Sequence, residues 1–160
     1  MKKVLLTAFR YSSAELLMKN VDNFKTMLLP NDKIKDSELL ISEISDNDYD
    51  LVISLGQRPN IKNKVHIETT AKLGVQSIDT EFDCDRLIFL CEKNGITAKI
   101  SHNAGTSFCN QLYFNVLRYI TNNRLKTKMV FVHIPFLKNI EDFESFRIKL
   151  FEIIKSVEDI

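Results

Sequence analysis

The sequence has almost no net charge and no long apolar run. Its 22 Lys and Arg residues balance 21 Asp and Glu residues, and no basic block exceeds a few positions. The basic surface of a dedicated nucleic-acid or anionic-membrane binder is therefore missing. No apolar run approaches the roughly 20 residues that span a bilayer, and the stretch from Val4 to Phe9 is too short for a signal peptide. We expect a cytoplasmic protein with neither nucleic acid nor membrane as a partner.

Cysteine, glycine and proline are also scarce, with three, four and three residues. Cys84, Cys91 and Cys109 are an odd number without Cys-x-x-Cys spacing, which argues against a disulfide framework and against a zinc site. We expect reduced thiols, no metal and no cofactor. The few Gly and Pro residues form no linker, and no repeat or low-complexity tract is present. Residues 1–160 are therefore expected to form a single domain.

Short apolar runs typical of buried strands alternate with amphipathic segments of helical length. Strands are expected at 3–8, 25–29, 50–55, 65–67, 97–102 and 129–134, and helices at 12–24, 32–45, 83–94, 107–122 and 141–157. The rest of 57–80 is expected to be loop. This alternation predicts a three-layer α/β/α fold, with a mostly parallel sheet and helices on both faces. The order of the strands is left open.

A cysteine stands at the start of one predicted helix. The segment 100–110 runs from a strand through a turn of small residues into a helix that Thr106 or Ser107 caps. Cys109 then lies in the first helical turn. There, unpaired backbone N–H groups and the positive end of the helix dipole favour a thiolate and can donate to an oxyanion.

A histidine stands at the end of the last predicted strand. The turn before Cys109 also follows the carboxyl end of a predicted strand, so in a parallel sheet we expect it and His133 at the same edge. Sites in open α/β sheets gather beyond these carboxyl ends. A Cys–His pair activates the thiol and supplies an acid for the leaving amine. Each residue alone is more often structural, a buried small hydrophobe or a hydrogen-bonded imidazole. Residue types and spacing therefore leave both interpretations open.

Four segments resemble the pyroglutamyl peptidase I family and follow the family's order. They are Lys3–Phe9, similar to its opening strand; Asp50–Gln57, similar to the strand that ends in a Gly-Gln turn; Ala104–Asn110 with Leu112 and Tyr113, similar to its nucleophile segment; and Phe131–Pro135, similar to its histidine segment. The resemblance implies a phosphorylase/hydrolase-like α/β/α fold in a homo-oligomer. It also implies a cysteine peptidase that removes amino-terminal 5-oxoproline from small peptides with a blocked amino terminus. By this resemblance Cys109 is the nucleophile and His133 the base.

The residue that completes the triad departs from the family pattern. The family has a Glu in a stretch that reads Glu-Arg-Val-Ala-Ile-Asn, and the best match here is the segment 63–68, which reads Asn-Lys-Val-His-Ile-Glu. This register puts Asn63 at the position of the acid, where an amide can orient an imidazole but lends it no charge. Glu68 is a substitute that the register argues against. The family's following arginine falls near Lys72.

The resemblance also suggests a pocket for the lactam ring. Phe9, Gln57 and Phe108 match positions around the family's pyrrolidone pocket, and Tyr11 is expected to replace an aromatic residue lost with a shortened opening loop. Aromatic faces hold a flat ring well, while backbone groups bind its amide. Plain core packing is the alternative for Phe9 and Phe108.

Three functions stay open from the sequence. The preferred one is a peptidase that removes amino-terminal pyroglutamate. The others are an inactive homologue that serves as a binding or assembly protein, because the acid and the pocket loops are altered, and a thiol hydrolase with a shifted substrate. His102, close to Cys109 in the chain, is the rival base, whereas His66 is expected to be structural.

Overall fold

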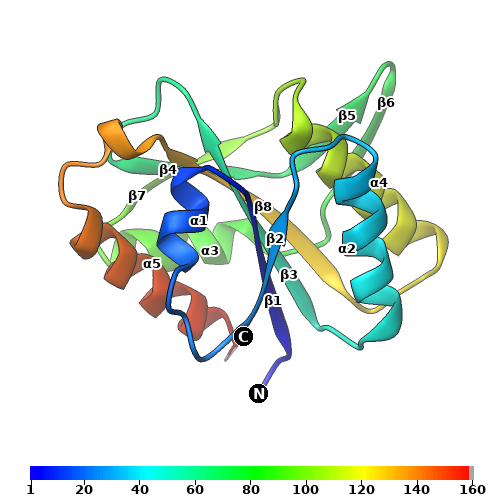
Figure 1. Cartoon of the computed structure of the whole chain (residues 1–160), viewed down its shortest axis with the longest axis horizontal. Helices are drawn as coiled ribbons and strands as arrows, with labels where there is room; N and C mark the ends of the chain where they lie inside the picture. The colour runs from blue at the N-terminus through cyan, green and yellow to red at the C-terminus, as the bar shows by residue number, and fades with distance from the viewer. Residues whose placement is uncertain (159–160) are drawn as a thin grey trace.

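A six-stranded sheet forms the centre of the computed structural model, which describes residues 1–158 (Figure 1). Its strands, in spatial order, are β2 (Lys25–Leu29), β1 (Val4–Phe9), β3 (Leu51–Arg58), β8 (Lys128–Pro135), β4 (Lys64–Glu68) and β7 (Thr97–Ser101). The first four run parallel to one another, whereas β4 is antiparallel to β8 and parallel to β7. The mostly parallel sheet expected from the sequence is confirmed.

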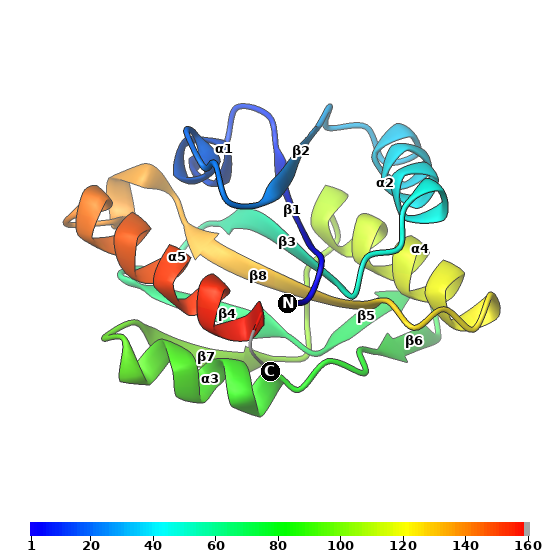
Figure 2. The same cartoon turned by 90° about the horizontal axis from the view of Figure 1, so that it is seen from below.

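Helices cover both faces of this sheet (Figure 2). One core contains side chains of α1 (Ser13–Met18), α3 (Cys84–Lys93) and α5 (Phe143–Glu158), and the other contains side chains of α2 (Lys35–Asp46) and α4 (Phe108–Asn122). A short 3-10 helix, Leu137–Asn139, leads from β8 toward α5. The predicted three-layer α/β/α arrangement is therefore confirmed.

The apolar runs of the strands explain this burial on both faces. In β1, Leu6 and Ala8 face the α1 side, while Leu5 and Phe9 face the α4 side, and every residue of the strand is buried. Side chains alternate along a strand, so a strand that is covered twice needs a continuous apolar run rather than an alternating one. The same reason accounts for β3 and β8.

Two local predictions were wrong. Residues expected to be loop form a hairpin of β5 (Thr70–Leu73) and β6 (Gln76–Asp79), joined by a two-residue turn in which Gly74 has φ +60°. Glycine adopts this conformation freely, so the turn is favoured. The first helix ends at Met18 rather than near residue 24, because Lys19 is extended and Asn20 has φ +61°.

Within residues 1–158, no helix is both long and apolar enough to cross a bilayer.

Candidate active site

Cys109 lies in the first turn of α4, as expected. The helix begins at Phe108 after Ser107, and the preceding turn contains Gly105 with φ +86°. The first helical N–H that donates within α4 belongs to Gln111, which bonds to the carbonyl oxygen of Ser107. The N–H groups before it therefore have no carbonyl partner within the helix and point beyond its start.

The thiol of Cys109 is seated against the end of β3. A Cβ atom placed on Gly56 would lie 2.7 Å from Cys109 Sγ and 2.8 Å from the ring of Phe131. Only a glycine at this position leaves room for the sulfur. In the pairing of β3 with β8, Gly56 lies opposite His133.

The structure brings Cys109 and His133 to the same face and the same end of the sheet. The rings of Phe131 and His133 lie side by side, with centroids 4.9 Å apart, and both residues project from β8 toward α4 because they are two positions apart. Phe131 also packs in the core that contains Cys109. Both reactive side chains are covered, with exposed fractions of 7% for Cys109 and 3% for His133.

A buried glutamate orients the imidazole. Glu68 Oε1 lies 2.8 Å from His133 Nδ1 and 3.0 Å from Arg58 Nη1, and the Glu68 side chain is fully buried. A carboxylate accepts the proton of Nδ1 and thereby leaves Nε2 free to take a proton from a neighbouring group. Cys109, His133 and Glu68 together have the chemistry of a thiol, a base and an orienting acid.

The structure does not bring Asn63 to His133. Asn63 precedes β4, and its Oδ1 accepts a hydrogen bond of 2.9 Å from the backbone N–H of Glu141. Because β4 is antiparallel to β8, residues before β4 lie past the end of β8, whereas His66 lies opposite His133 and Glu68 opposite Phe131. The register that placed Asn63 at the acid's position is corrected: Glu68, in place of the family's Asn, supplies the carboxylate.

Burial decides the state of the thiols. It raises the pKa of Cys109 to about 12, against hydrogen bonds from its own backbone N–H and from Ser107, which lower the pKa. Burial therefore has a larger effect on this pKa than the hydrogen bonds at the start of the helix, which runs against the expectation of a thiolate in the free protein. Burial likewise raises the pKa of Cys84 and of Cys91 to about 12, and both residues pack in the opposite core.

Two of the four predicted pocket residues pack in the same region as Cys109. The ring centroid of Phe9 is 6.5 Å from that of Phe108 and 6.4 Å from that of Phe131. Phe108 precedes Cys109 in α4 and is 38% exposed, while Phe9 is buried. These rings form the apolar wall next to Cys109.

The other two predicted pocket residues point elsewhere. Gln57 belongs to the face of β3 that packs toward α1, where its Oε1 accepts a hydrogen bond of 3.0 Å from the N–H of Ser13. Tyr11 is 89% exposed. The expectation that these two side chains hold the lactam is not supported, since one stabilises the start of α1 and the other extends into solvent.

The other two histidines, His66 and His102, have different surroundings from His133. The Nδ1 atom of His102 lies 2.6 Å from Thr69 Oγ1, so the rival base is tied to the end of β4 rather than to the thiol. His66 lies opposite His133, and burial lowers its pKa. Among the described residues, no group of three His, Cys, Asp or Glu side chains is arranged to hold a metal ion.

Sequence reasoning missed the roles of Glu68 and Arg58. Matching by position argues against Glu68 because it assumes that the acid stays at one point of the motif, whereas the strand pairing decides which residue reaches His133. Arg58 directly follows the Gly-Gln pair, which was the available signal. Its Nη1 contacts both Glu68 and the carbonyl oxygen of Asn103.

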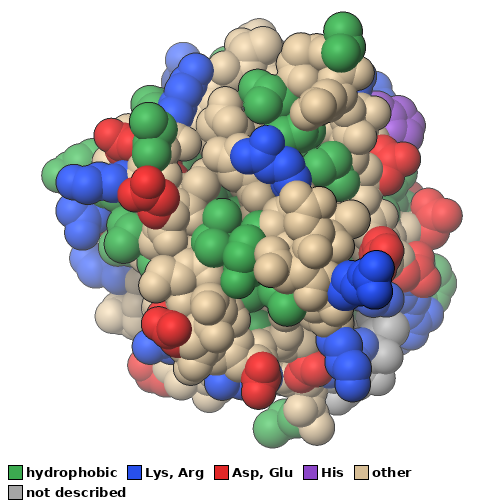
Figure 3. Space-filling view, turned by 90° about the vertical axis from the view of Figure 1, so that its right-hand side faces the viewer, with side chains coloured by type: hydrophobic (Ala, Val, Ile, Leu, Met, Phe, Trp, Pro, Cys, Tyr) green, Lys and Arg blue, Asp and Glu red, His purple; other side chains and the backbone are tan. Residues whose placement is uncertain are grey.

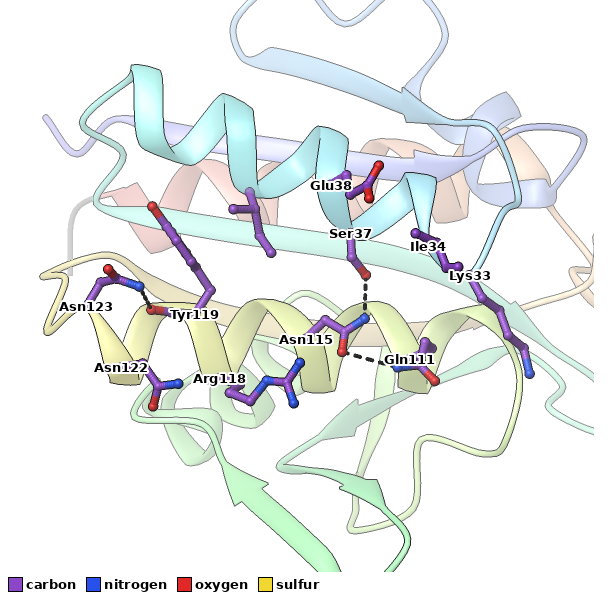
Figure 4. A pocket seen from close by; sticks show the side chains of 11 residues that line it. Lys33, Ile34, Ser37, Glu38, Gln111, Asn115, Arg118, Tyr119, Asn122 and Asn123 are labelled. Atoms are coloured by element: carbon purple, nitrogen blue, oxygen red, sulfur yellow. Dashed lines mark hydrogen bonds between the residues drawn. The ribbon is translucent and has the colours of Figure 1, made fainter.

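A separate groove lies between α2 and α4, on the side of the molecule shown in Figure 3, where uncharged atoms dominate the centre. It has a volume of about 650 Å³, and its walls carry amide side chains. In Figure 4, Asn115 forms a hydrogen bond across the groove to Ser37 of α2 and another along α4 to Gln111. None of the predicted catalytic residues lines it.

Comparison with known proteins shows the family of this chain. The family model described as pyroglutamyl peptidase matches residues 74–145. A pyrrolidone-carboxylate peptidase of Fusobacterium nucleatum is 31% identical, over 86% of this chain and 79% of that protein. This chain belongs to the pyroglutamyl peptidase family. Pyrrolidone-carboxylate peptidase 2 of Caldanaerobacter subterraneus is 27% identical, over 84% of this chain and 82% of that protein.

Solved structures of this family share the fold. The crystal structure of pyroglutamyl peptidase I from Bacillus amyloliquefaciens superimposes with a TM-score of 0.86, covering 99% of this chain and 96% of that one at 19% identity. Pyrrolidone carboxyl peptidase from Fervidobacterium islandicum gives 0.82, with 99% of both chains covered at 20% identity. The fold is therefore that of the family even where the sequence has diverged.

Proposed function

We propose that this protein is a cysteine peptidase that removes amino-terminal pyroglutamate from peptides, with Cys109 as nucleophile, His133 as base and Glu68 as the residue that orients His133. The observation that carries the proposal is the hydrogen bond from His133 Nδ1 to buried Glu68, beside a thiol at the start of α4. Membership of the pyroglutamyl peptidase family supplies the substrate class.

The reaction begins on a neutral thiol. Since burial holds the pKa of Cys109 far above neutrality, His133 Nε2 takes the thiol proton as Sγ attacks the carbonyl carbon of the pyroglutamyl residue. The oxyanion accepts hydrogen bonds from the unpaired N–H groups at the start of α4. The imidazolium is stabilised by Glu68 and returns the proton to the nitrogen of the leaving peptide, which breaks the amide bond. Water then hydrolyses the thioester, with His133 again as the base.

We expect the lactam ring of the substrate to enter the site at the wall formed by Phe9 and Phe108. A ring held between two aromatic faces needs about 7–8 Å between them, twice the optimal carbon–carbon contact. The centroids of Phe9 and Phe108 are 6.5 Å apart and their planes are tilted by 42°, so the two rings pack on each other in the free protein. Phe108 is the more exposed of the two, so we propose that its ring moves aside when the substrate binds and uncovers Cys109.

Release of 7-amino-4-methylcoumarin from its pyroglutamyl amide tests this function. We expect release by the native protein and none by Cys109→Ala, whose fold is checked by circular dichroism. Prolyl and glutaminyl amides serve as substrate controls, because they lack the lactam carbonyl or the closed ring. Activity that survives Cys109→Ala would remove this thiol from the mechanism. Cleavage of a control amide alone would favour the shifted substrate, and no cleavage at all would favour the inactive homologue.

We also expect the homo-oligomer that the family resemblance implies. Sedimentation velocity measures this directly, and a monomer at micromolar concentration would contradict the expectation.

A further inference from the structure

Arg58 connects the two halves of the candidate active site. It lies at the end of β3, and a single nitrogen of its guanidinium, Nη1, donates to Glu68 Oε1 at 3.0 Å and to the carbonyl oxygen of Asn103 at 2.7 Å. Glu68 orients His133. Asn103 belongs to the turn that leads into α4 and Cys109.

We propose that Arg58 is a positioning residue for the peptidase reaction: it fixes the acid–base pair and the nucleophile turn relative to each other. This inference rests on the proposed function. Arg58 touches neither reacting atom. It acts through Glu68 on one side and through the turn before Cys109 on the other.

The first part of this role is electrostatic. Glu68 is fully buried, and its second oxygen, Oε2, has no hydrogen-bond partner within residues 1–158, so the carboxylate is held through Oε1 alone. A buried carboxylate is costly unless a cation and hydrogen bonds compensate it. Arg58 supplies a permanent positive charge at that oxygen, which compensates the burial of the carboxylate.

The second part is mechanical. The turn at 102–107 is irregular, and its internal bonds include Gly105 N–H to Asn103 Oδ1 at 3.0 Å and a longer contact of 3.3 Å between Ser101 Oγ and the carbonyl oxygen of Asn103. The bond from Arg58 to that same carbonyl oxygen is shorter and comes from a central strand of the sheet. It therefore anchors the turn to the rigid part of the fold, and a nucleophile displaced by about 1 Å costs on the order of 100-fold in rate.

The experiment compares native protein with Arg58→Ala, Arg58→Lys and the control Arg86→Ala, an exposed arginine of α3 in the opposite layer. We expect Arg58→Ala to lower kcat on the pyroglutamyl coumarin amide by on the order of 10- to 100-fold with little change in KM. We expect Arg58→Lys to lie in between, because an ammonium keeps the charge but does not place its nitrogen as the guanidinium does. Added methylguanidinium should restore part of the activity of Arg58→Ala. Arg86→Ala should match the native protein.

Hydrogen exchange of the amides at 104–110 is measured in parallel and does not depend on activity. Faster exchange there in Arg58→Ala, with unchanged exchange in α5, supports the anchoring role. An Arg58→Ala variant with native kcat and native exchange would overturn the inference, and so would a variant whose KM alone rises, since Arg58 would then bind substrate. Equal loss of protection across the whole chain in both Arg58 variants would also overturn it, as a purely structural role. An inactive native protein would refute the proposed function, while the exchange would still decide whether Arg58 anchors the turn.

Discussion

Replacing Gly56 by alanine should damage both the packing and the chemistry of this site. The added Cβ would lie 2.7 Å from Cys109 Sγ and 2.8 Å from the nearest ring carbon of Phe131. Carbon atoms pack best at about 3.5–4.0 Å, so both neighbours have to move. Neither is the free end of a long exposed side chain: Cys109 is short and Phe131 is fully buried.

The expected loss of stability follows from these contacts. Overpacking of a filled core costs about 1–3 kcal/mol, and the smaller conformational freedom of alanine in the unfolded chain offsets about 0.4–1 kcal/mol. A net loss of about 1–2 kcal/mol corresponds to a fall of about 2–8 °C in melting temperature for a chain of this size. The loss in kcat should be larger in proportion, on the order of 100-fold, because the added methyl group displaces the sulfur from its position in the site.

Thermal unfolding and hydrolysis of the pyroglutamyl coumarin amide measure the two effects. Gly74→Ala is the matched control, because its Cβ would meet no atom within 4 Å. Its backbone φ of +60° still costs about 1–2 kcal/mol, so it lowers stability without touching the site. The double variant of Gly56→Ala with Phe131→Leu should lose less stability than the sum of the single variants, by 0.5 kcal/mol or more, on the order expected for residues in contact. A Gly56→Ala protein with native melting temperature and native kcat would refute the reasoning.

Three further substitutions probe the same region. Glu68→Gln keeps an acceptor for His133 but removes the charge, so kcat should fall by on the order of 10²- to 10⁴-fold, measured on the coumarin amide at saturating substrate. Tyr113→Phe removes the hydroxyl that donates to the carbonyl oxygen of Glu68 at 2.8 Å, and urea unfolding should report a loss of about 1–2 kcal/mol. Burial lowers the pKa of His66 from its ordinary 6.5, so the unfolded chain binds this proton more readily. Above pH 6.5 His66 is neutral in both states and its titration does not lower the free energy of unfolding. As the pH falls from 6.5 through the lowered value, the unfolded chain takes up the proton first, and the free energy of unfolding decreases. The melting temperature of His66→Gln should therefore fall less than that of the native protein between about pH 7.5 and 5, and equal falls would contradict this.

The layers of the fold could be predicted from the sequence because burial on both faces leaves a continuous apolar pattern. The runs at 3–8 and 129–134 contain few polar residues, and such strands exist only in a sheet that is covered twice. The order of the strands and the antiparallel direction of β4 could not be predicted, because pairing depends on contacts between segments far apart in the chain. The hairpin at 70–79 was missed, since its strands are short and half exposed.

The candidate site could be predicted only where a local signal was present. Cys109 after a turn of small residues and His133 before a proline have such signals, and the structure brings them to one end of the sheet. The state of the thiol could not be predicted in the same way. A helix start lowers the pKa of a cysteine, but burial raises it, and the extent of burial depends on Gly56 and Phe131, which are distant in sequence.

The position of the acid shows why a motif is weaker evidence than a strand pairing. In an antiparallel pair, successive residues of β4 run back along β8, and those on one face, His66 and Glu68, approach His133 from its own side of the sheet. A glutamate side chain is long enough to reach an imidazole from a position two residues away from the direct partner, as the 2.8 Å contact of Glu68 with His133 requires. What the chemistry needs is a carboxylate on that face within that reach, rather than a glutamate at one place in a motif. Arg58 provides the charge that makes this buried position tenable, since it bonds to the same oxygen from the neighbouring end of β3. A carboxylate beside His133 can therefore be present even where the acid at the family's customary position is absent.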